Sequence, residues 1–260
     1  MSSFWQLFKA NLKMFLREKE GFYWNLVMPG LIYIALSILP IGKLADSPTR
    51  YSAYVLPGII AMTIMQGGIY SLAYWMVDLK SRGIIKRLLA TPIKQWQLAL
   101  SLVCGRLVIV VIQVTILTLL GAFAFHATFA PYSSPGDYTG FAGNILSTLL
   151  LVLLGGAIFL ALGLIISRFA HSYDSAAPIT SAIGLPLTFL GNIFYPISAL
   201  PPALQTFAKF LPITYLADGL RQAYLYPFNF EKIGWDILML TIWLIIMLIV
   251  LASVFKLKED

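Results

Sequence analysis

Side chains that could perform catalysis are scarce in this 260-residue sequence, and they form no recognisable catalytic pattern. The two histidines, His126 and His171, lie far apart in segments that we expect to be loops, and there is no H-E-x-x-H metal motif. The lone Cys104 excludes an intrachain disulfide and any metal site with several cysteines. No G-x-x-x-x-G-K-[ST] loop is present to hold a nucleotide phosphate. We therefore expect no catalytic residue, no metal and no cofactor in this chain.

The carboxylates argue against a transporter driven by an ion gradient. Asp78, Asp137, Asp174 and Asp236 all fall near the ends of long apolar runs. Ion-coupled transporters place ionisable groups or broken helices near the middle of the membrane to bind the driving ion. If the protein moves a solute, we expect the energy to come from a separate component.

The best candidate for contact with such a component is the most basic stretch of the chain, residues 78–97, which holds five Lys or Arg residues and one acid. The sequence predicts a short amphipathic helix over residues 80–91, stopped by Thr91-Pro92 because the residue before a proline is pushed out of the α region. Such a helix suits docking into a partner's groove, and a charged loop that only sets orientation fits the residues equally well. Its apolar face would carry Ile84, Ile85, Leu88 and Leu89, and its polar face Arg82, Lys86 and Arg87.

The elements that must position this helix are membrane spans. Charged residues make up 11% of the sequence and hydrophobic residues 59%, whereas a soluble domain carries about 25% charged residues. A span needs roughly 20 apolar residues, so a chain of this length allows about six. The composition excludes a soluble enzyme and predicts an all-α polytopic membrane protein with one transmembrane domain over residues 1–260. The six spans are expected at residues 22–41, 51–77, 98–125, 144–167, 175–195 and 233–255.

Residues 1–20 predict a helix that lies in the membrane interface before the first span. Apolar residues recur at helical spacing on one face, and basic residues occupy another. A solvated helix packed on a partner is the alternative, but aromatic residues suit the depth of the interface. The residues concerned are Trp5, Phe8, Lys9, Lys13 and Arg17.

Residues 196–225 are interrupted by prolines and predict a hairpin of two short amphipathic helices, at 201–210 and 215–224. With six spans this hairpin lies on the side opposite both termini. Of the basic residues outside the spans, twelve fall on the side of the termini and five on the other, which places both termini in the cytoplasm. Because the basic residues cluster beside spans, the net charge of +7 indicates topology rather than nucleic-acid binding.

Two further charged positions lead to specific expectations. Arg106 falls inside the third span, and we expect its long side chain to snorkel to the cytoplasmic surface. Asp218 and Arg221 are three residues apart in a predicted helix. We interpret them as a local ion pair rather than as a contact with substrate.

Four segments together resemble the permeases of type-2 ABC exporters, a family that exports drugs, polysaccharides and lipids. The first is the basic helix with its proline stop, and the other three follow the fifth span in the order and spacing of that family. The likeness covers nearly the whole chain, including the amphipathic start. The segments are Arg82–Ile93, Phe194–Pro201, Leu211–Tyr215 and Asp218–Arg221.

The resemblance implies a half-transporter that pairs with a second copy of itself or with a close homologue. Each copy would dock on a separate ABC ATPase subunit, two per complex, and these subunits would bind ATP and Mg²⁺. The coupling helix that contacts the ATPase would comprise Arg82, Gly83, Ile84, Ile85, Lys86, Arg87, Leu88 and Leu89, although many relatives carry an acid in place of Lys86. A re-entrant hairpin at 196–225 would close the extracellular end of the path, with Tyr195, Pro196, Pro201, Pro212, Tyr215 and Arg221.

The expected function is ATP-driven export of an amphipathic or lipid-like substrate, drugs included, by alternating access. Aromatic, uncharged spans favour such cargo over small ions. A polysaccharide or glycolipid exporter of the same class is the alternative, while a self-sufficient secondary transporter or a membrane-embedded enzyme fits the residues less well. We expect the protein in the cell membrane of a prokaryote, surrounded by lipid, with both termini in the cytoplasm and no nucleic-acid partner.

Overall fold

The computed structural model describes residues 3–17, 19–38, 51–89, 95–125 and 138–254, and within these ranges the chain forms helices and short connections without any strand. The first half contains α1 (Ser3–Arg17), α2 (Lys19–Ile38), α3 (Tyr51–Gln66), the π-helix η1 (Gly67–Ser71), α4 (Leu72–Ser81), α5 (Ile84–Leu89) and α6 (Gln95–Phe125). The second half contains α7 (Tyr138–Phe169), α8 (Tyr173–Leu190), the 3₁₀ turn η2 (Ile197–Ala199), α9 (Pro202–Ala208), α10 (Pro212–Leu225) and α11 (Phe230–Val254).

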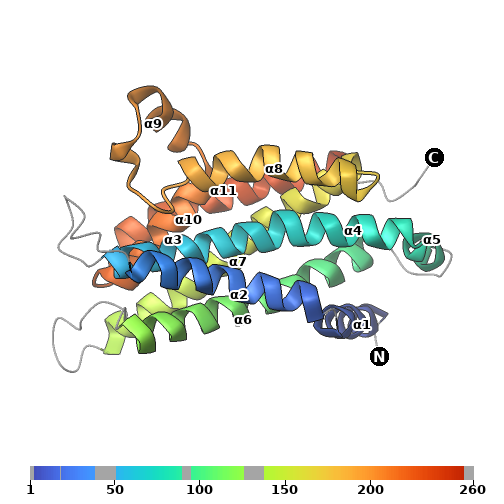
Figure 1. Ribbon diagram of the computed structural model, residues 1–260, viewed down its shortest axis with the longest axis horizontal. Coiled ribbons are helices and arrows are strands. Elements are labelled where there is room, and N and C mark those ends of the chain that lie inside the picture. The colour runs from blue at the N-terminus through green and yellow to red at the C-terminus, as the bar shows by residue number, and fades with distance from the viewer. Residues whose placement is uncertain (1–2, 18, 39–50, 90–94, 126–137, 255–260) are drawn as a thin grey trace.

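The long helices lie side by side along one axis and alternate in direction (Figure 1). The continuous rod α3–η1–α4 runs through the bundle beside α2, α6, α7 and α8. One end of the bundle carries α1 and α5, and the opposite end carries α9 and α10 (Figure 1). We call these the α5 end and the α9 end.

Four helical rods are long and apolar enough to cross a membrane: Tyr51–Ser81, Gln97–Phe125, Gly140–Phe169 and Phe230–Val254. They have 25 to 31 residues, more than the roughly 20 that a hydrocarbon core requires. The apolar part of α2 is shorter, Val27–Ile38, and α8 begins with polar residues and contains Pro178 and Pro186. Both lie alongside the other rods (Figure 1), and the six-span prediction stays a prediction for these two.

Several boundaries differ from those expected from the sequence. The second rod continues to Ser81 instead of ending at residue 77, because the helix extends past the apolar run into charged residues. The fifth ends at Leu190 rather than at residue 195, because Gly191 caps it and Asn192 adopts a positive φ of 55°. The second helix of the expected hairpin begins earlier than predicted, at Pro212, where the fixed φ of proline suits the first helical position.

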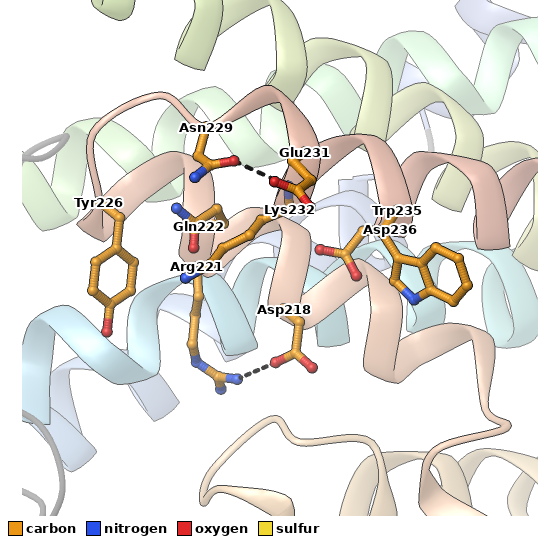
Figure 2. Close-up of a pocket in the computed structure, with 9 residues that line it drawn as sticks. All are labelled: Asp218, Arg221, Gln222, Tyr226, Asn229, Glu231, Lys232, Trp235 and Asp236. Atoms are coloured by element: carbon orange, nitrogen blue, oxygen red, sulfur yellow. Dashed lines mark hydrogen bonds and ion pairs between the residues drawn. The ribbon is translucent and has the colours of Figure 1, made fainter.

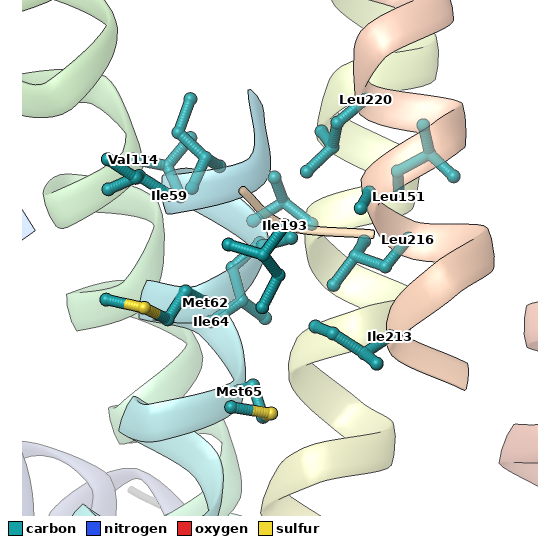
Figure 3. Close-up of a cluster of buried hydrophobic side chains, with 14 of the residues drawn as sticks. Ile59, Met62, Ile64, Met65, Val114, Leu151, Ile193, Ile213, Leu216 and Leu220 are labelled. Carbon is teal, nitrogen blue, oxygen red and sulfur yellow. The ribbon is translucent and has the colours of Figure 1, made fainter. Parts of the chain in front are cut away.

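The core of the bundle is built around α3. Within the rod Tyr51–Ser81, 83% of the most apolar stretch is buried, compared with 6% for α11, so α3 is central and α11 peripheral. Figure 3 shows Ile59, Met62 and Met65 of α3 facing side chains from three other helices and from the segment after α8. The labelled partners are Val114 of α6, Leu151 of α7, Ile193, and Ile213, Leu216 and Leu220 of α10.

Candidate functional site

The α5 end carries a sharp turn between α4 and α5. Gly83 adopts a φ of +67°, a left-handed conformation that glycine accepts most readily. The amide of Arg82 donates to the Asp78 carbonyl at 3.0 Å, and that of Gly83 to the Lys80 carbonyl at 2.9 Å. This turn shortens the expected coupling helix: α5 begins at Ile84 rather than at residue 80, and its expected end at residue 91 lies outside the described residues.

The short helix α5 has one buried and one exposed side. Ile85 is buried and Ile84 half-buried in a hydrophobic cluster with residues of α1, α4, α6 and α7, whereas Arg82 and Arg87 are exposed. The side chains of Lys86, Leu88 and Leu89 lie outside the described residues. The apolar side of α5 therefore belongs to the same cluster as side chains of other helices, and basic groups remain accessible on its outer side. The cluster members from those helices are Leu7, Leu72, Trp75, Met76, Leu79, Leu98, Leu102, Val103, Leu107, Leu160 and Leu164.

The base of α5 is tied to the neighbouring end of the bundle by polar contacts. The Asp78 carboxylate pairs with the guanidinium of Arg82 at 2.9 Å and accepts a hydrogen bond from the Tyr173 hydroxyl at 3.1 Å. Lys80 donates to the backbone carbonyl of Ser167 at the end of α7. These contacts connect the turn to the first residue of α8 and to the last turn of α7.

Helix α1 lies at the same end and is seen nearly end on in Figure 1. Trp5 and Phe8 stack with their ring centroids 5.2 Å apart, and the Lys9 ammonium lies 5.2 Å from the Trp5 ring. Lys13 and Arg17 are exposed. The helix packs along α6, where the Asn11 amide donates to the Ser101 hydroxyl at 3.0 Å. The predicted amphipathic helix is present, and its place in a membrane interface stays a prediction.

The expectation that Arg106 snorkels to the surface is wrong. Its side chain is buried, donates to the Ser71 hydroxyl and lies 4.9 Å from the Trp75 ring. Ser71 is the last residue of the π-helix, and Trp75 follows one turn later. Burial is possible because the hydroxyl and the aromatic face replace water around the guanidinium. The arginine therefore joins α6 to the irregular part of the α3–η1–α4 rod.

At the α9 end Arg221 of α10 has a larger role than the local pair expected from its spacing. The pair with Asp218 is present at 3.4 Å. The same buried guanidinium also donates to the carbonyls of Tyr54 at 3.3 Å, of Ile193 at 2.9 Å and of Asn192, and lies 4.0 Å from the Tyr54 ring. One side chain thus joins α10, α3 and the segment after α8. We call this arrangement the Arg221 clamp.

The segment held by the clamp, residues 191–195, has further contacts that fix its path. The Asn192 amide donates to Asp218, and its side-chain oxygen accepts from the Tyr54 hydroxyl at 3.2 Å. Asparagine tolerates its positive φ better than most residues do. A Cβ at position 58 would lie 2.1 Å from the Ile193 carbonyl oxygen, so only glycine permits this segment to lie so close to α3.

The remaining residues of the expected hairpin occupy structural positions at this end. The Tyr195 hydroxyl donates to the Phe189 carbonyl, Pro196 precedes η2, and Pro201 precedes α9. Pro212 is buried at the start of α10, and Tyr215 is half-buried one turn later. Figure 1 shows α9 projecting from the bundle, while α10 lies within it.

A pocket of about 630 Å³ opens between α10 and α11 beside the clamp (Figure 2). Partial burial here raises the pKa of the Asp218 carboxyl, and Arg221 and the Asn192 amide oppose that rise. Three acids line the pocket, yet among the described residues no three His, Cys, Asp or Glu side chains are grouped closely enough to hold a metal ion. The lining residues are Asp218, Arg221, Gln222, Tyr226, Asn229, Glu231, Lys232, Trp235 and Asp236.

The predicted site residues therefore separate into two groups at opposite ends of the bundle. The basic helix and α1 share the α5 end, whereas α9 and α10 share the opposite end (Figure 1). The hairpin residues belong to that opposite end: Tyr195, Pro196 and Pro201 lie between α8 and α9, and Pro212, Tyr215 and Arg221 lie on α10. Sequence reasoning missed Tyr54, Asn192 and Gly58, whose importance depends on contacts 26 to 167 residues away along the chain. The sequence signal nearest to this site was the pair Asp218 and Arg221, whose spacing indicates only a local contact.

The similarity of this chain to known proteins extends over most of its helices. Residues 2–225 match the family model described as ABC-2 type transporter. The chain is 24% identical over 210 residues to the putative transport permease YvfS of Bacillus subtilis, covering 81% of this chain and 80% of the relative. It is 25% identical over 208 residues to the inner membrane transport permease YadH of Escherichia coli, covering 76% and 75%.

A relative with lower identity has a name that includes a class of cargo. The probable multidrug ABC transporter permease YbhR of Escherichia coli is 22% identical over 194 residues, which cover 74% of this chain and 50% of that relative. The family match spans α1 to α10 and so includes the basic turn, the π-helix and the Arg221 clamp. On this match the chain belongs to the ABC-2 type transporter family.

Proposed function

We propose that this protein is the permease subunit of an ATP-driven exporter and that a separate ABC ATPase binds α5. The observation that supports this most is the construction of α5 itself. Exposed Arg82 and Arg87 face outward, while Ile85 is buried among side chains of α1, α4, α6 and α7. A partner that moves the basic side must move the apolar side with it, and that side belongs to the core.

The Arg221 clamp is proposed as the closure of the path at the extracellular end. It joins α3, α10 and the segment after α8 through three carbonyls, an aromatic face and one acid. In alternating access the α5 end would be open while the clamp is closed, and ATP-driven movement of α5 would reverse the two. The permease itself would hold no ATP, Mg²⁺ or other cofactor.

The assembly would contain two permeases and two ATPases. Within the described residues, α3 fills the centre of the bundle with packed side chains (Figure 3). We therefore propose that the path forms between two copies of this chain, or between this chain and a close homologue. Both termini would be in the cytoplasm of a prokaryotic cell, with α1 in the inner membrane interface.

The proposed cargo is amphipathic or lipid-like, and drugs are included because one relative bears a multidrug name. Export of a polysaccharide or glycolipid by the same mechanism is the second candidate. Transport driven by an ion gradient is less well supported, because the acids of the described rods, Asp78, Glu231 and Asp236, lie near rod ends.

The test is ATP-dependent uptake into inside-out vesicles that contain the protein purified together with the ATPase from its native host. Hoechst 33342 reports drug transport, and a fluorescent phosphatidylethanolamine reports lipid transport. We expect uptake of at least one probe that vanadate abolishes and an uncoupler does not. Uptake that an uncoupler abolishes and that needs no ATP would overturn the proposal.

A charge-reversal variant tests the role of α5 directly. We expect Arg82→Glu combined with Arg87→Glu to lose the copurified ATPase activity while the permease remains monodisperse, because the reversed charges repel a surface that binds cations. Lys209→Glu is the matched control: it reverses an exposed charge at the α9 end and should retain the ATPase. Equal ATPase recovery from both variants would remove α5 as the contact.

A further inference from the structure

The exposed side of α1 carries a row of basic residues that has no part in the proposed transport cycle. The helix contains Lys9, Lys13 and Arg17 and no acidic residue, and all three basic residues are exposed. Residues four apart lie one above the other on the same face of a helix, so the three form one row about 12 Å long at 1.5 Å per residue. We call it the α1 basic row. No acid of α1 offsets its charge, so the row attracts anions.

Apolar side chains border the α1 basic row. Viewed down the helix axis at 3.6 residues per turn, Trp5 lies on one side of the three basic residues and Met14 on the other. Both are large exposed apolar residues, at 43% and 38%. A helix with basic residues between apolar edges suits the boundary between lipid headgroups and acyl chains, because its basic side chains extend to the phosphates and tryptophan is enriched at that depth. An acidic protein surface would complement the charges but not these edges.

The opposite side of α1 fixes how the helix lies. Asn11 donates to the Ser101 hydroxyl of α6 at 3.0 Å, and Leu7 packs against the cluster that holds Ile85. Figure 1 shows the long rods running across the picture and α1 nearly end on, so α1 crosses the rods instead of extending them. Ser101 lies four residues after Gln97, where the apolar rod begins, which is about 6 Å along α6. Interfacial amphipathic helices bury their apolar face about 5–10 Å, so the contact with α6 places α1 at that level.

We propose that the α1 basic row binds the phosphate groups of anionic phospholipids and so holds the α5 end in an anionic membrane surface. The phosphodiester of phosphatidylglycerol carries a net negative charge that complements the row. Phosphatidylcholine carries its own ammonium group beside the phosphate and offers no net charge, so it should bind less well. The apolar edges of the row would contact the acyl chains of the same lipids. The inference does not depend on ATP-driven export.

The test uses the permease copurified with its ATPase, in phosphatidylcholine nanodiscs with a trace of phosphatidylglycerol that carries a diazirine on its headgroup. After illumination without ATP, mass spectrometry locates the labelled residues. We expect labels concentrated on residues 5–17. Unlabelled phosphatidylglycerol should displace them, whereas glycerol 3-phosphate, which carries a phosphate without acyl chains, should not. The α9 end meets the same lipids in the same disc, so labelling around the exposed Lys209 gives the background.

Substitutions measure how much the charges of the row contribute. Lys13→Gln should lower the labelling of residues 5–17 about fivefold, as expected for the loss of one basic residue beside an anionic surface. Lys9→Gln, Lys13→Gln and Arg17→Gln combined should lower it about 100-fold. Lys13→Arg keeps the charge and should keep the labelling. Lys209→Gln is the matched control, because it removes an exposed lysine at the opposite end and should leave the labelling unchanged.

Several results would overturn the inference. Equal labelling of residues 5–17 by a photoreactive phosphatidylcholine would show ordinary lipid contact, and displacement by glycerol 3-phosphate would show a site for a soluble phosphate. Equal labelling in Lys13→Gln and Lys209→Gln would show that the charge of the row does not matter. Labels that appear on the permease alone but not in the complex would show that the ATPase covers the row.

The outcome is separate from that of the transport assay. Because the labelling uses no ATP, a complex that labels as expected but does not transport would support the inference and count against the proposed function. A complex that transports without these labels would overturn the inference and leave the proposed function untouched.

Discussion

Replacing Arg221 with methionine should destabilise the protein much more than neutralising its acidic partner Asp218. The Arg221 side chain is 7% exposed and donates to three backbone carbonyls, whereas 43% of the Asp218 side chain is exposed. Methionine fills a similar volume but donates nothing. The three carbonyls would then stay buried without their donor.

The size of the effect can be worked out from these contacts. At about 1 kcal/mol for each hydrogen bond, three lost donors cost about 3 kcal/mol, which agrees with the 3 to 5 kcal/mol typical of removing one partner from a buried ion pair. Asp218→Asn should cost about 1 kcal/mol or less, because the pair is part-exposed and asparagine still accepts a hydrogen bond. Arg221→Lys should fall between the two, since lysine keeps the charge without the planar fork.

The measurement is unfolding of the purified protein by SDS in mixed micelles, followed by helical circular dichroism. Size-exclusion chromatography of each variant before titration excludes aggregation. The free energies of Arg221→Met, Asp218→Asn and the double variant form a cycle, and we expect a coupling of about 1 kcal/mol or less. If Asp218→Asn cost as much as Arg221→Met, the ion pair and not the carbonyl contacts would hold the segment, and the reasoning would be refuted.

Three further predictions concern the backbone and the α5 end. Gly58→Ala should lower the free energy of unfolding by about 2 kcal/mol or more, because its Cβ would lie 2.1 Å from a carbonyl oxygen. Gly234→Ala is the control: the position has open space around it, so this variant should be stabilised by about 0.5–1 kcal/mol. Equal effects in thermal unfolding would contradict the close packing at Gly58. Gly83→Ala should speed hydrogen exchange of the α5 amides about fivefold. Gly83→Asn should speed it less, since asparagine tolerates a positive φ better than alanine does. The same exchange rate in both variants would argue against the left-handed turn. Tyr173→Phe removes the hydrogen bond to Asp78 and should lower the free energy of unfolding by about 1 kcal/mol or less. Hydrogen exchange of the amides at the start of α8 should become faster. Unchanged exchange there would show that the contact does not tie α8 to α4.

The sequence predicted the parts of the fold that depend on local patterns. The apolar positions of the coupling segment have helical spacing, and Ile85 is indeed buried while Arg82 and Arg87 are exposed. Pro212 was expected to separate the two hairpin helices, but it begins α10, because proline fits the first position of a helix. The exact start of α5 was missed because Gly83 could continue a helix at a moderate cost or reverse it, and its neighbours do not decide between the two.

The candidate site was much harder to predict because its contacts join distant parts of the chain. The spacing of Asp218 and Arg221 shows only an i, i+3 pair, and nothing near them in the sequence reveals that Arg221 meets the carbonyls of Asn192 and Ile193. Arg106 was placed at the surface for a similar reason. Its hydrogen-bond partner Ser71 lies 35 residues earlier on another helix. The sequence of α6 alone therefore does not show the contact that offsets the cost of burying the guanidinium.

One of the elements that run between the two ends of the molecule contains an irregular segment. The rod α3–η1–α4 extends from the clamp residue Tyr54 to Asp78 at the base of α5. A straight α-helix transmits displacement along its axis with little change, whereas a π-helical turn contains a wider, less regular hydrogen-bond pattern and is often found at functional sites. The π-helix Gly67–Ser71 lies inside this rod and packs mainly against α7, and Arg106 of α6 binds its last residue. If an ATPase displaces α5, the part of the rod beyond Ser71 can shift only as far as the Arg106 contact and the packing on α7 allow. Helices α6 and α7 must therefore either move together with α4 or limit its movement.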